Sequence, residues 1–440
     1  MKLLSLMVGG FRNVAETTIE LGGITAFVSP NNYGKSNLLD AIKFATEFIN
    51  ESPRTRSVMM GYVGGIPLVP KLANSDFRFQ VEFEDPDLGE YRFVRYGFSF
   101  SWRRDDGTGQ VITDESIEIN PQRGGRWTNY LRRDKGKYKK SHDTRSFRTI
   151  QLDGNQLAID VLTAIEDIDI NPAIKKIKEI GFSLCASLDA SGRFHPMLLE
   201  MKTGSDSDRM AAFDDEDLPR AMYRLKVNHK DRYDDLLAAL YTLFPEFEDI
   251  AVNPYELRKE EHEALKKQLH GQDGAENEPD IPFRIRDELY RMTVRSSFLN
   301  QPVNMDMMST GTKRIVWLLT NVIIAEAFDA QCIGIEEIET SIHPKMLGEL
   351  LELLDENIGE TSLLITSHSP FLIQYLKPQQ IYIGEPSDNG IARFKRIRED
   401  EVEKVNSYAH DRGLGFGEYL FELMSSDGDA SAMLASVLEG

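Results

Sequence analysis

The segment Ser29–Ser36 has the residue types and the spacing of a loop that binds phosphate groups. It reads Ser-Pro-Asn-Asn-Tyr-Gly-Lys-Ser, follows an apolar stretch that predicts a strand, and opens a stretch with helical spacing. Lys35 would reach the β- and γ-phosphates of a nucleotide, and the Ser36 hydroxyl would hold Mg²⁺. Backbone N–H groups of the loop would bind phosphate oxygens, among them those of Asn31, Asn32 and Gly34. Ser29 stands where the usual pattern has glycine, but serine is small, so the alternative of a chance loop-to-helix turn is disfavoured.

Two adjacent carboxylates, Glu336 and Glu337, follow an apolar stretch that begins at Cys332. The pattern predicts a buried strand whose end supplies acids to the nucleotide site. Glu336 would support the Mg²⁺ shell, at a position where Asp is commoner, and Glu337 would orient or deprotonate the attacking water. Taken alone, the motif fits a buried strand that ends in solvated carboxylates equally well.

Ser309 and Gly311 lie in the segment Met308–Arg314, just before an apolar run with helical spacing. They predict a second anion site at a helix N-terminus. The simpler alternative is an N-cap, in which Ser309 or Thr310 accepts hydrogen bonds from the first N–H groups of the helix.

His368 follows a third apolar strand candidate, within Thr366-Ser367-His368-Ser369-Pro370. An imidazole at this point would hydrogen-bond the γ-phosphate, although a single histidine after a strand is more often structural. No second His or Cys stands at the spacing of a zinc site, so zinc is not expected.

The elements that must position these residues lie at the two ends of the chain. Near the start, the patterns predict strands Leu3–Val8 and Thr25–Ser29, then a helix Ser36–Asn50. A hairpin follows, and the predicted strands of this β-rich stretch are Phe77–Glu84, Tyr91–Arg103 and Gln110–Asn120.

Strands and helices alternate again from Ile281 onward, which predicts a parallel sheet. The predicted elements are the strand Gln331–Ile335, the helix Pro344–Asn357 and the strands Ser362–Thr366 and Gln380–Gly384. Residues 156–244 are expected to be mostly helical, and Tyr255–Pro279 is expected to be a solvated helix followed by a loop. The chain therefore divides into residues 1–120, an inserted segment 121–280, and residues 281–440, with the two ends forming one α/β domain.

Composition excludes several classes of protein. The chain has 440 residues, of which 41% are hydrophobic and 28% charged, which excludes a mostly disordered chain and a membrane protein. The start is too short and too weakly apolar for a secretory signal. Cys185 and Cys332 form no CxxC motif, so a reducing, cytoplasmic location is expected. The net charge of −20 excludes a uniformly basic nucleic-acid binder, but not a local basic patch.

Such a patch is predicted in Arg123–Arg148, where ten residues are Lys or Arg. Aromatic residues are interleaved with them: Trp127, Tyr130, Tyr138 and Phe147. Cations bind phosphates and aromatic rings stack on unpaired bases, which favours a nucleic-acid contact. The alternative is a loop that pairs with the acidic remainder of the chain or docks a partner protein.

The order of the motifs resembles the head domain of ABC-type ATPases. Ser309 lies 274 residues after Lys35, Glu337 lies 28 after Ser309, and His368 lies 31 after Glu337. Within that group the chain is similar to the RecF/SMC-related branch, which includes the OLD-family ATPases and bacterial anti-phage defence ATPases. The segments that carry this further resemblance are Phe11-Arg12, Glu336–Pro344 and Leu243–Pro245.

The resemblance implies an α/β fold, namely an ABC-type P-loop ATPase head with a mixed sheet, flanking helices and an inserted β-rich and helical lobe. It also implies ATP and Mg²⁺, and a dimer or larger assembly in which Ser309 and Gly311 of one head cap the nucleotide held by Lys35 and Ser36 of another.

The resemblance further implies an ATPase that acts as a nucleotide-gated sensor or scaffold in anti-phage defence and controls a separately encoded effector. Asp427-Gly428-Asp429 is similar to a TOPRIM nuclease motif, but the 72 residues after His368 are too few for that domain, so an acidic turn is expected. The alternative function is a RecF/SMC-like DNA-repair ATPase that clamps DNA when it binds ATP.

Overall fold

The computed structural model describes the chain apart from residues 134–135, 166, 187, 202–216, 259, 261–262, 266–282, 287, 386–388, 426–428 and 440. It contains two compact units. The first unit comprises Met1–Ala186, Ala330–Ile338 and Glu360–Gly440, and the second comprises Ser187–Asp329 and Glu339–Gly359. These units cut the chain at other places than the three segments proposed above, whose boundaries remain a prediction.

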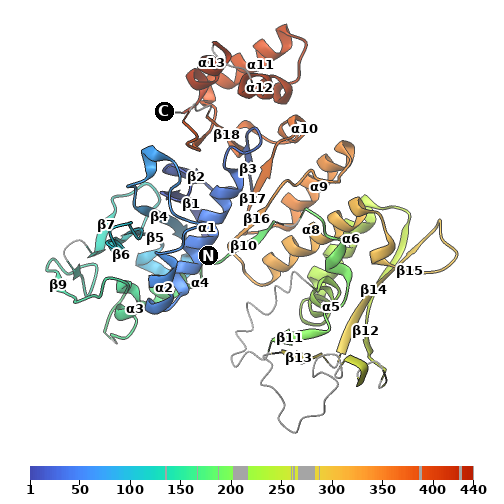
Figure 1. The fold of residues 1–440 in the computed structure, drawn as a ribbon, viewed down its shortest axis with the longest axis horizontal. Helices are drawn as coiled ribbons and strands as arrows, with labels where there is room; N and C mark the ends of the chain where they lie inside the picture. The colour runs from blue at the N-terminus through green and yellow to red at the C-terminus, as the bar shows by residue number, and fades with distance from the viewer. Residues whose placement is uncertain are drawn as a thin grey trace. The chain divides into compact units, whose positions relative to one another are not determined.

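The first unit contains a six-stranded sheet in the order β10-β16-β17-β3-β18-β19 (Figure 1). Its strands are β10 (Phe182–Cys185), β16 (Cys332–Ile335), β17 (Ser362–Ser367), β3 (Ile24–Val28), β18 (Ile381–Gly384) and β19 (Phe394–Lys395). The first five run parallel, and β19 is antiparallel to β18. Every residue of β3, β16, β17 and β18 is buried, as expected for parallel strands covered on both faces. The predicted parallel sheet is thus confirmed.

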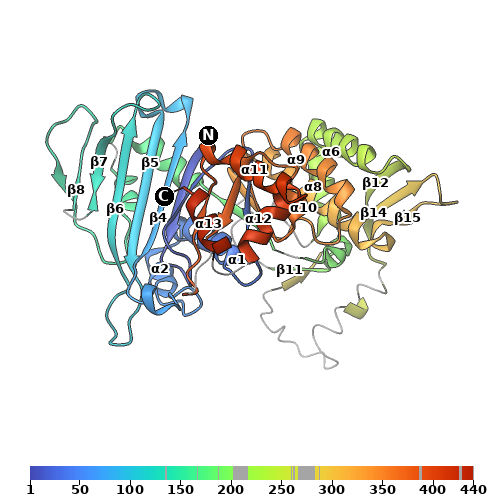
Figure 2. The same ribbon diagram turned by 90° about the horizontal axis from the view of Figure 1, so that it is seen from above.

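A second sheet of the first unit is antiparallel and has eight strands in the order β2-β1-β4-β5-β6-β7-β8-β9 (Figure 2). The strands are β1 (Lys2–Gly9), β2 (Thr17–Glu20), β4 (Phe77–Glu84), β5 (Phe93–Ser101), β6 (Val111–Asn120), β7 (Thr128–Arg132), β8 (Lys137–Tyr138) and β9 (Arg148–Thr149). The predicted hairpin and third strand are confirmed as β4, β5 and β6. Buried and less buried residues alternate along β4, because one face of this sheet meets the core.

Helix α1 (Lys35–Asn50) contacts strands of both sheets and carries the phenylalanines that bind the unit together. Phe48 stacks on Phe98 and Phe100 of β5, each with a centroid distance of 5.0 Å, and Phe44 meets Phe77 of β4 at 5.3 Å. Burying large aromatic side chains stabilises such a core by about 1.5–3 kcal/mol each. This packing holds α1 against the antiparallel sheet, and the predicted phosphate loop joins the helix at its other end, at Lys35.

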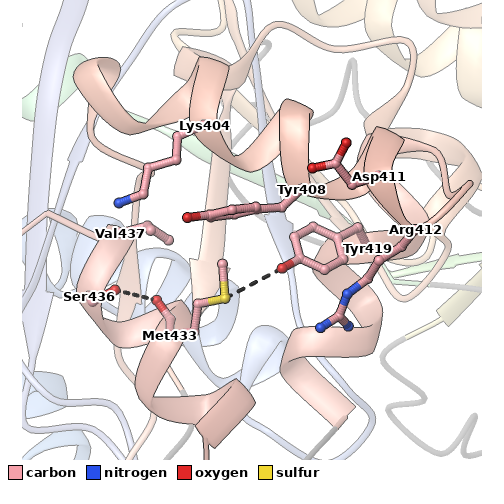
Figure 3. Close-up of a pocket in the computed structure, with 8 residues that line it drawn as sticks. All are labelled: Lys404, Tyr408, Asp411, Arg412, Tyr419, Met433, Ser436 and Val437. Carbon is pink, nitrogen blue, oxygen red and sulfur yellow. Dashed lines mark hydrogen bonds between the residues drawn. The ribbon is translucent and has the colours of Figure 1, made fainter.

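The remaining helices of the first unit lie in two groups. In the first group, α2 (Pro53–Met59) follows α1 along the chain, and α3 (Ala158–Leu162) and α4 (Asn171–Glu179) follow the last strand of the antiparallel sheet. The other comprises α10 (Pro370–Ile373), α11 (Val402–Asp411), α12 (Phe416–Ser425) and α13 (Asp429–Val437). The latter three surround a cavity of about 330 Å³ in which Tyr408, Tyr419 and Met433 lie (Figure 3). No predicted nucleotide-site residue lines this cavity.

The described part of the second unit has four long helices: α5 (Leu218–Asn228), α6 (Lys230–Leu243), α8 (Thr310–Ala327) and α9 (Pro344–Asn357). Its strands are β11 (Leu199–Met201), β12 (Phe247–Glu256), β13 (Phe283–Ile285), β14 (Glu288–Ser296) and β15 (Val303–Asn304). Antiparallel pairing joins β12 to β14, β14 to β15, and β11 to β13.

Two sequence predictions about the middle of the chain need correction. Residues 156–244 are not all helix and loop, because the strand β10 lies among them and completes the parallel sheet beside β16. The prediction of a helix from Tyr255 is wrong at its start, since Tyr255 and Glu256 end β12. Most of the following loop, together with Asp427 and Gly428, lies outside the described residues.

None of the helices in the described part of the chain combines the length and apolar character that crossing a bilayer requires.

Candidate nucleotide-binding site

The order of the parallel strands brings three predicted motifs to one edge of the sheet. Strand β17 lies between β3 and β16, and Ile365 is in register with Ala26 on one side and Ile335 on the other. Parallel strands end at the same edge, where α/β proteins bind their ligands. The loop after β3, the acids after β16 and His368 after β17 therefore gather there, although they are far apart in sequence.

The phosphate loop has the backbone shape that its sequence predicts. Gly34 has φ 126° and Asn32 has φ 60°, and only glycine adopts the former readily. A Cβ at Gly34 would lie 2.8 Å from the Ala392 Cβ. The loop is tied to the N-terminal hairpin, which is formed by β1 and β2. Asn13, between these strands, donates to the Tyr33 carbonyl (3.0 Å) and accepts from the Asn37 side chain (2.7 Å).

Ser29 fits its position because β18 carries a glycine beside it. Ser29 is fully buried, and a Cβ on Gly384 would lie only 2.6 Å from the Ser29 Cβ. The side chain of Ser29 therefore fits because Gly384, on the neighbouring strand, has no side chain of its own. The departure from the usual motif is accommodated by the sheet and leaves the loop geometry intact.

Lys35 is the cation of this loop. Its Nζ donates to the carbonyl oxygens of Ser29 (2.8 Å) and Pro30 (3.1 Å), and the side chain is buried. The ammonium is thereby held over the loop that would surround the phosphates.

Ser36 and Glu336 are brought together across the sheet edge and share a side-chain hydrogen bond. Burial raises the pKa of Glu336, and the hydrogen bond from Ser36 opposes that rise. The carboxylates of Asp40 and Glu337 raise it further, while Lys35 lowers it. Acids set this close together repel one another, so a divalent cation between them and the phosphates would relieve the repulsion.

This donor set fits Mg²⁺ bound together with a nucleotide. Mg²⁺ in such sites takes one or two protein oxygens and completes its shell with phosphates and water. Ser36 and Glu336 supply such oxygens. Within the described ranges no group of three or more His, Cys, Asp or Glu is placed to hold a metal ion.

Glu337 is held in an uncommon backbone conformation, with φ 44°. Its N–H donates to the buried Thr366 Oγ1 at 3.0 Å, which locks the end of β16 to β17. Positive φ in a non-glycine residue costs of order 1 kcal/mol and often marks a functional site. His368 is exposed at the end of β17, so its imidazole is accessible to a ligand at this edge.

Sequence reasoning did not assign Arg12 and Asp40 to the site. The Arg12 Nη1 lies 2.6 Å from Asp40 Oδ2 and 2.8 Å from Asn37 Oδ1, and its Nε donates to the Gly64 carbonyl (2.7 Å). Asp40 follows Ser36 by one helical turn, which places it on the same face of α1. That spacing was the available signal, whereas the partner Arg12 depends on tertiary structure.

Ser309 and Gly311 lie in the second unit. Ser309 is the N-cap of α8, because its Oγ accepts from the Thr312 N–H at 3.1 Å, so the capping alternative holds. The serine is exposed, and a Cβ at Gly311 would lie 2.5 Å from the Ser341 carbonyl. A role of this helix end toward the nucleotide of a second copy remains a prediction.

The geometry defines a P-loop ATPase-like protein: a mixed α/β fold with a parallel sheet, flanking helices and a lysine-bearing loop at the carboxyl edge. The model of a family described as "AAA domain" matches residues 5–277. The chain belongs to this AAA-domain family, which implies ATP as the ligand, together with its hydrolysis.

A second family model, described as "AAA domain, putative AbiEii toxin, Type IV TA system", matches residues 204–374. No curated protein sequence matches the chain significantly.

Solved structures with similarity to the chain include head domains of SMC proteins. One, an SMC head bound to the C-winged helix domain of ScpA, is 13% identical with a TM-score of 0.49 and covers 92% of this chain and all of that one. The SMC head domain from Thermotoga maritima is 11% identical with a TM-score of 0.43, over 90% of this chain and all of that one. A head with an extended coiled coil, bound to a ScpA domain derived from Pyrococcus furiosus, is 12% identical with a TM-score of 0.44, over 93% and 99%.

Proposed function

We propose that this chain is an ATP-hydrolysing, nucleotide-gated switch. The observation that carries the proposal is the meeting of Lys35, Ser36 and Glu336 at one sheet edge, with the serine hydrogen-bonded to the carboxylate. A cation, a hydroxyl and an acid in that arrangement are the parts that phosphoryl transfer requires for positioning and charge stabilisation.

Each residue has a distinct task in this proposal. The N–H groups of Asn31, Asn32 and Gly34 hold phosphate oxygens, and Lys35 neutralises the β- and γ-phosphates. Ser36 and Glu336 hold Mg²⁺, which when bound withdraws charge from the phosphate oxygens. Glu337 orients or deprotonates the attacking water, and His368 hydrogen-bonds the γ-phosphate.

We further propose that two copies are needed for turnover. A single loop leaves the γ-phosphate open to water, whereas a second helix N-terminus adds donors and excludes solvent. Ser309 and Gly311 of α8 would supply that N-terminus from another copy. ATP would then close the assembly and hydrolysis would open it, so the nucleotide state sets the shape that a partner protein reads.

The proposed biological role is a sensor or scaffold of an anti-phage defence system in the cytoplasm, without a membrane partner, which controls a separately encoded effector. The description of the family model over residues 204–374 as an AbiEii-type toxin of a toxin–antitoxin system supports this role. An ATPase that holds an effector in one nucleotide state and releases it in the other would suit such a system.

The test is steady-state ATP hydrolysis by the full chain and by Glu337→Gln, with and without duplex DNA. We expect Glu337→Gln to bind ATP with unchanged affinity and to lose at least about a hundredfold in turnover, since general-base catalysis contributes about 10²–10⁴. Glu360→Gln, an exposed acid of the same unit, is the matched control. Hydrolysis at the wild-type rate in Glu337→Gln would remove that residue from the base role.

The second candidate function is an ATPase that clamps DNA on ATP binding. Exposed basic side chains at the edge of the antiparallel sheet favour it. Strong stimulation of hydrolysis by duplex DNA would support the clamp, and turnover that DNA leaves unchanged would support the nucleotide-gated scaffold.

A further inference from the structure

The antiparallel sheet of the first unit ends in a strip of positive charge. At this end β7, β8 and β9 are neighbours in that order, and Figure 2 shows β7 and β8 at the edge of the sheet. Arg132 of β7 and Lys137 of β8 are directly opposite partners, and Lys139 directly follows β8. The Lys139 ammonium lies 5.3 Å from the centre of the Phe147 ring. We call Arg132, Lys137, Lys139 and Phe147 the basic edge.

The pairing of Arg132 with Lys137 is unfavourable for the fold itself. Directly opposite residues of an antiparallel pair have Cβ atoms about 5 Å apart, and like charges there destabilise the sheet. Within the part of the chain that the structure describes, no carboxylate pairs with any of the three cations; Arg132 hydrogen-bonds the neutral side-chain amide of Asn129.

Other cations of the same run are used by the fold. The Arg133 guanidinium is nearly fully buried, lies 3.6 Å from the Glu115 carboxylate and donates to the Asp153 carbonyl (2.7 Å). Lys140 pairs with Asp167 at 3.1 Å. The structure thus divides the basic run into cations paired with a carboxylate, of which the side chain of Arg133 is buried and that of Lys140 is more exposed, and the cations of the basic edge.

Farther into the sheet, on β4, β5 and β6, a cation is paired with carboxylates. Arg95 of β5 pairs with Glu82 at 3.0 Å and with Glu118 at 3.1 Å, and its guanidinium lies 4.1 Å from the Trp127 ring centre. Trp127 is therefore already stacked. Phe147 also has a cation beside it, the Lys139 ammonium at 5.3 Å, but 38% of its surface is exposed, so part of this ring is accessible to a base.

We propose that the basic edge binds single-stranded nucleic acid. Arg132, Lys137 and Lys139 contact the sugar-phosphate backbone, and an unpaired base stacks on Phe147. The chain carries a net charge of −20, which repels a polyanion at long range, so binding depends on short-range contacts at a local patch. A ring beside the cations favours a single strand over a duplex, because only unpaired bases expose a face for stacking.

This site is separate from the proposed ATPase function. None of the nucleotide-site residues belongs to the basic edge, so binding is expected without ATP. DNA and RNA share the backbone chemistry and the stacking, and the two are distinguished by the probes of the test.

The test is fluorescence anisotropy on the full chain without nucleotide, using labelled dT and U oligomers of about 30 nucleotides, longer than the sites of about 4–16 nucleotides typical of single-strand binders. A duplex of the same length is the third probe. The variant Arg132→Glu/Lys137→Glu/Lys139→Glu is compared with Lys71→Glu/Arg103→Glu/Arg104→Glu, which changes the charge equally at exposed residues elsewhere.

We expect the wild type and the control to bind the single strands, and the first variant to lose at least about tenfold in affinity. The slope of log K against log salt should fall by about 2, because each lost single-strand phosphate contact removes about 0.7. Phe147→Ala should weaken single-strand binding by about fivefold or more and leave duplex binding unchanged, and Phe147→Tyr should restore it, because stacking is worth about 1–3 kcal/mol per base.

An equal loss of affinity in the two charge-reversal variants would overturn the proposal, since it would show that binding depends only on the overall charge of the protein. Absence of binding by the wild type would also overturn it and leave the docking of an acidic protein as the use of this edge. Circular dichroism of each variant separates loss of binding from loss of folding, and Phe147→Ala tests the site without any change of charge.

Discussion

Lys35 is held over its loop by two carbonyl oxygens, and the neighbouring Ser36 shares a hydrogen bond with Glu336 from the end of β16. At the scale of single residues, the charges of this site are arranged in advance of any ligand. Such an arrangement costs no reorganisation when the phosphates enter, which is the main way in which proteins stabilise the charge of phosphoryl transfer.

Lys35→Ala is predicted to weaken ATP binding by at least about tenfold, since a charge-assisted hydrogen bond is worth about 1.5–3 kcal/mol. Titration calorimetry measures the affinity. Lys43→Ala is the control, because Lys43 lies on the same helix but is exposed. Equal affinities of the two variants would show that the loop does not bind the phosphates.

Asp160 shows how a residue can matter for folding alone. Its carboxylate accepts hydrogen bonds from the fully buried Arg56 of α2 and from Lys178 of α4 (2.9 Å). Arg56 also donates to the carbonyls of Phe48 and Ile49 at the end of α1, at 2.8 Å each. Burial by itself would raise the pKa of Asp160, but the hydrogen bonds from Arg56 and Lys178 outweigh it, and the net shift is downward.

Asp160→Asn is therefore predicted to lower the free energy of unfolding by about 2–3 kcal/mol at pH 7, because it leaves the buried Arg56 without its counter-charge. A lowered pKa means that the ionised form stabilises the fold above the unfolded-state pKa, and that this contribution is lost as the pH falls through the folded-state value. The difference from wild type should thus shrink below about pH 4. Urea unfolding at several pH values measures it, with the exposed Asp167→Asn as a control expected to change stability by less than about 1 kcal/mol. If the difference in unfolding free energy between Asp160→Asn and the wild type did not change with pH, the ionised Asp160 carboxylate would not be the stabilising group.

At the scale of elements, the N-terminus of α8 carries the Ser309 cap, and we propose that it also contacts the γ-phosphate held by another copy. Ser309 caps the helix, and it is exposed. An aspartate caps as well as a serine and suits the helix dipole, but it would repel a γ-phosphate.

Ser309→Asp should keep the melting temperature and lose at least about tenfold in ATP turnover, whereas Ser309→Ala should lose about 1 kcal/mol of stability. Differential scanning fluorimetry and the hydrolysis assay measure the two effects. If Ser309→Asp hydrolyses ATP normally, the residue is a cap and nothing more.

At the scale of the whole molecule, the proposed mechanism requires two copies, because the second helix terminus of the site would come from another chain. The two compact units of one chain supply one loop and one such helix.

Light scattering after gel filtration is predicted to show Glu337→Gln at 50.0 kDa without nucleotide and at about twice that mass with ATP, since binding energy that favours the closed state shifts the population. Two double variants, Glu337→Gln with Lys35→Ala and Glu337→Gln with Ser309→Asp, should stay at the lower mass when ATP is added. A mass that ATP does not change would argue against the sandwich while leaving the nucleotide site itself intact.

Sequence by itself located the strands β3, β16, β17 and β18, the helix that follows the loop, and the residues at their ends. These are local properties: an apolar run predicts a buried strand, and glycine before lysine and serine predicts a turn that binds phosphate. The same local reasoning was wrong for β10 and for the start of the Tyr255 segment, because a strand there is stabilised by its neighbours β16 and β14 and not by its own pattern.

Tertiary structure alone decided which distant residues meet. Sheet order placed Glu336 against Ser36, Gly384 made room for Ser29, and Arg12 reached Asp40 from the N-terminal hairpin. It also separated Arg133, which is buried against Glu115, from the exposed Arg132 beside it. Register and strand order depend on contacts between segments hundreds of residues apart, whose free energies no local pattern contains.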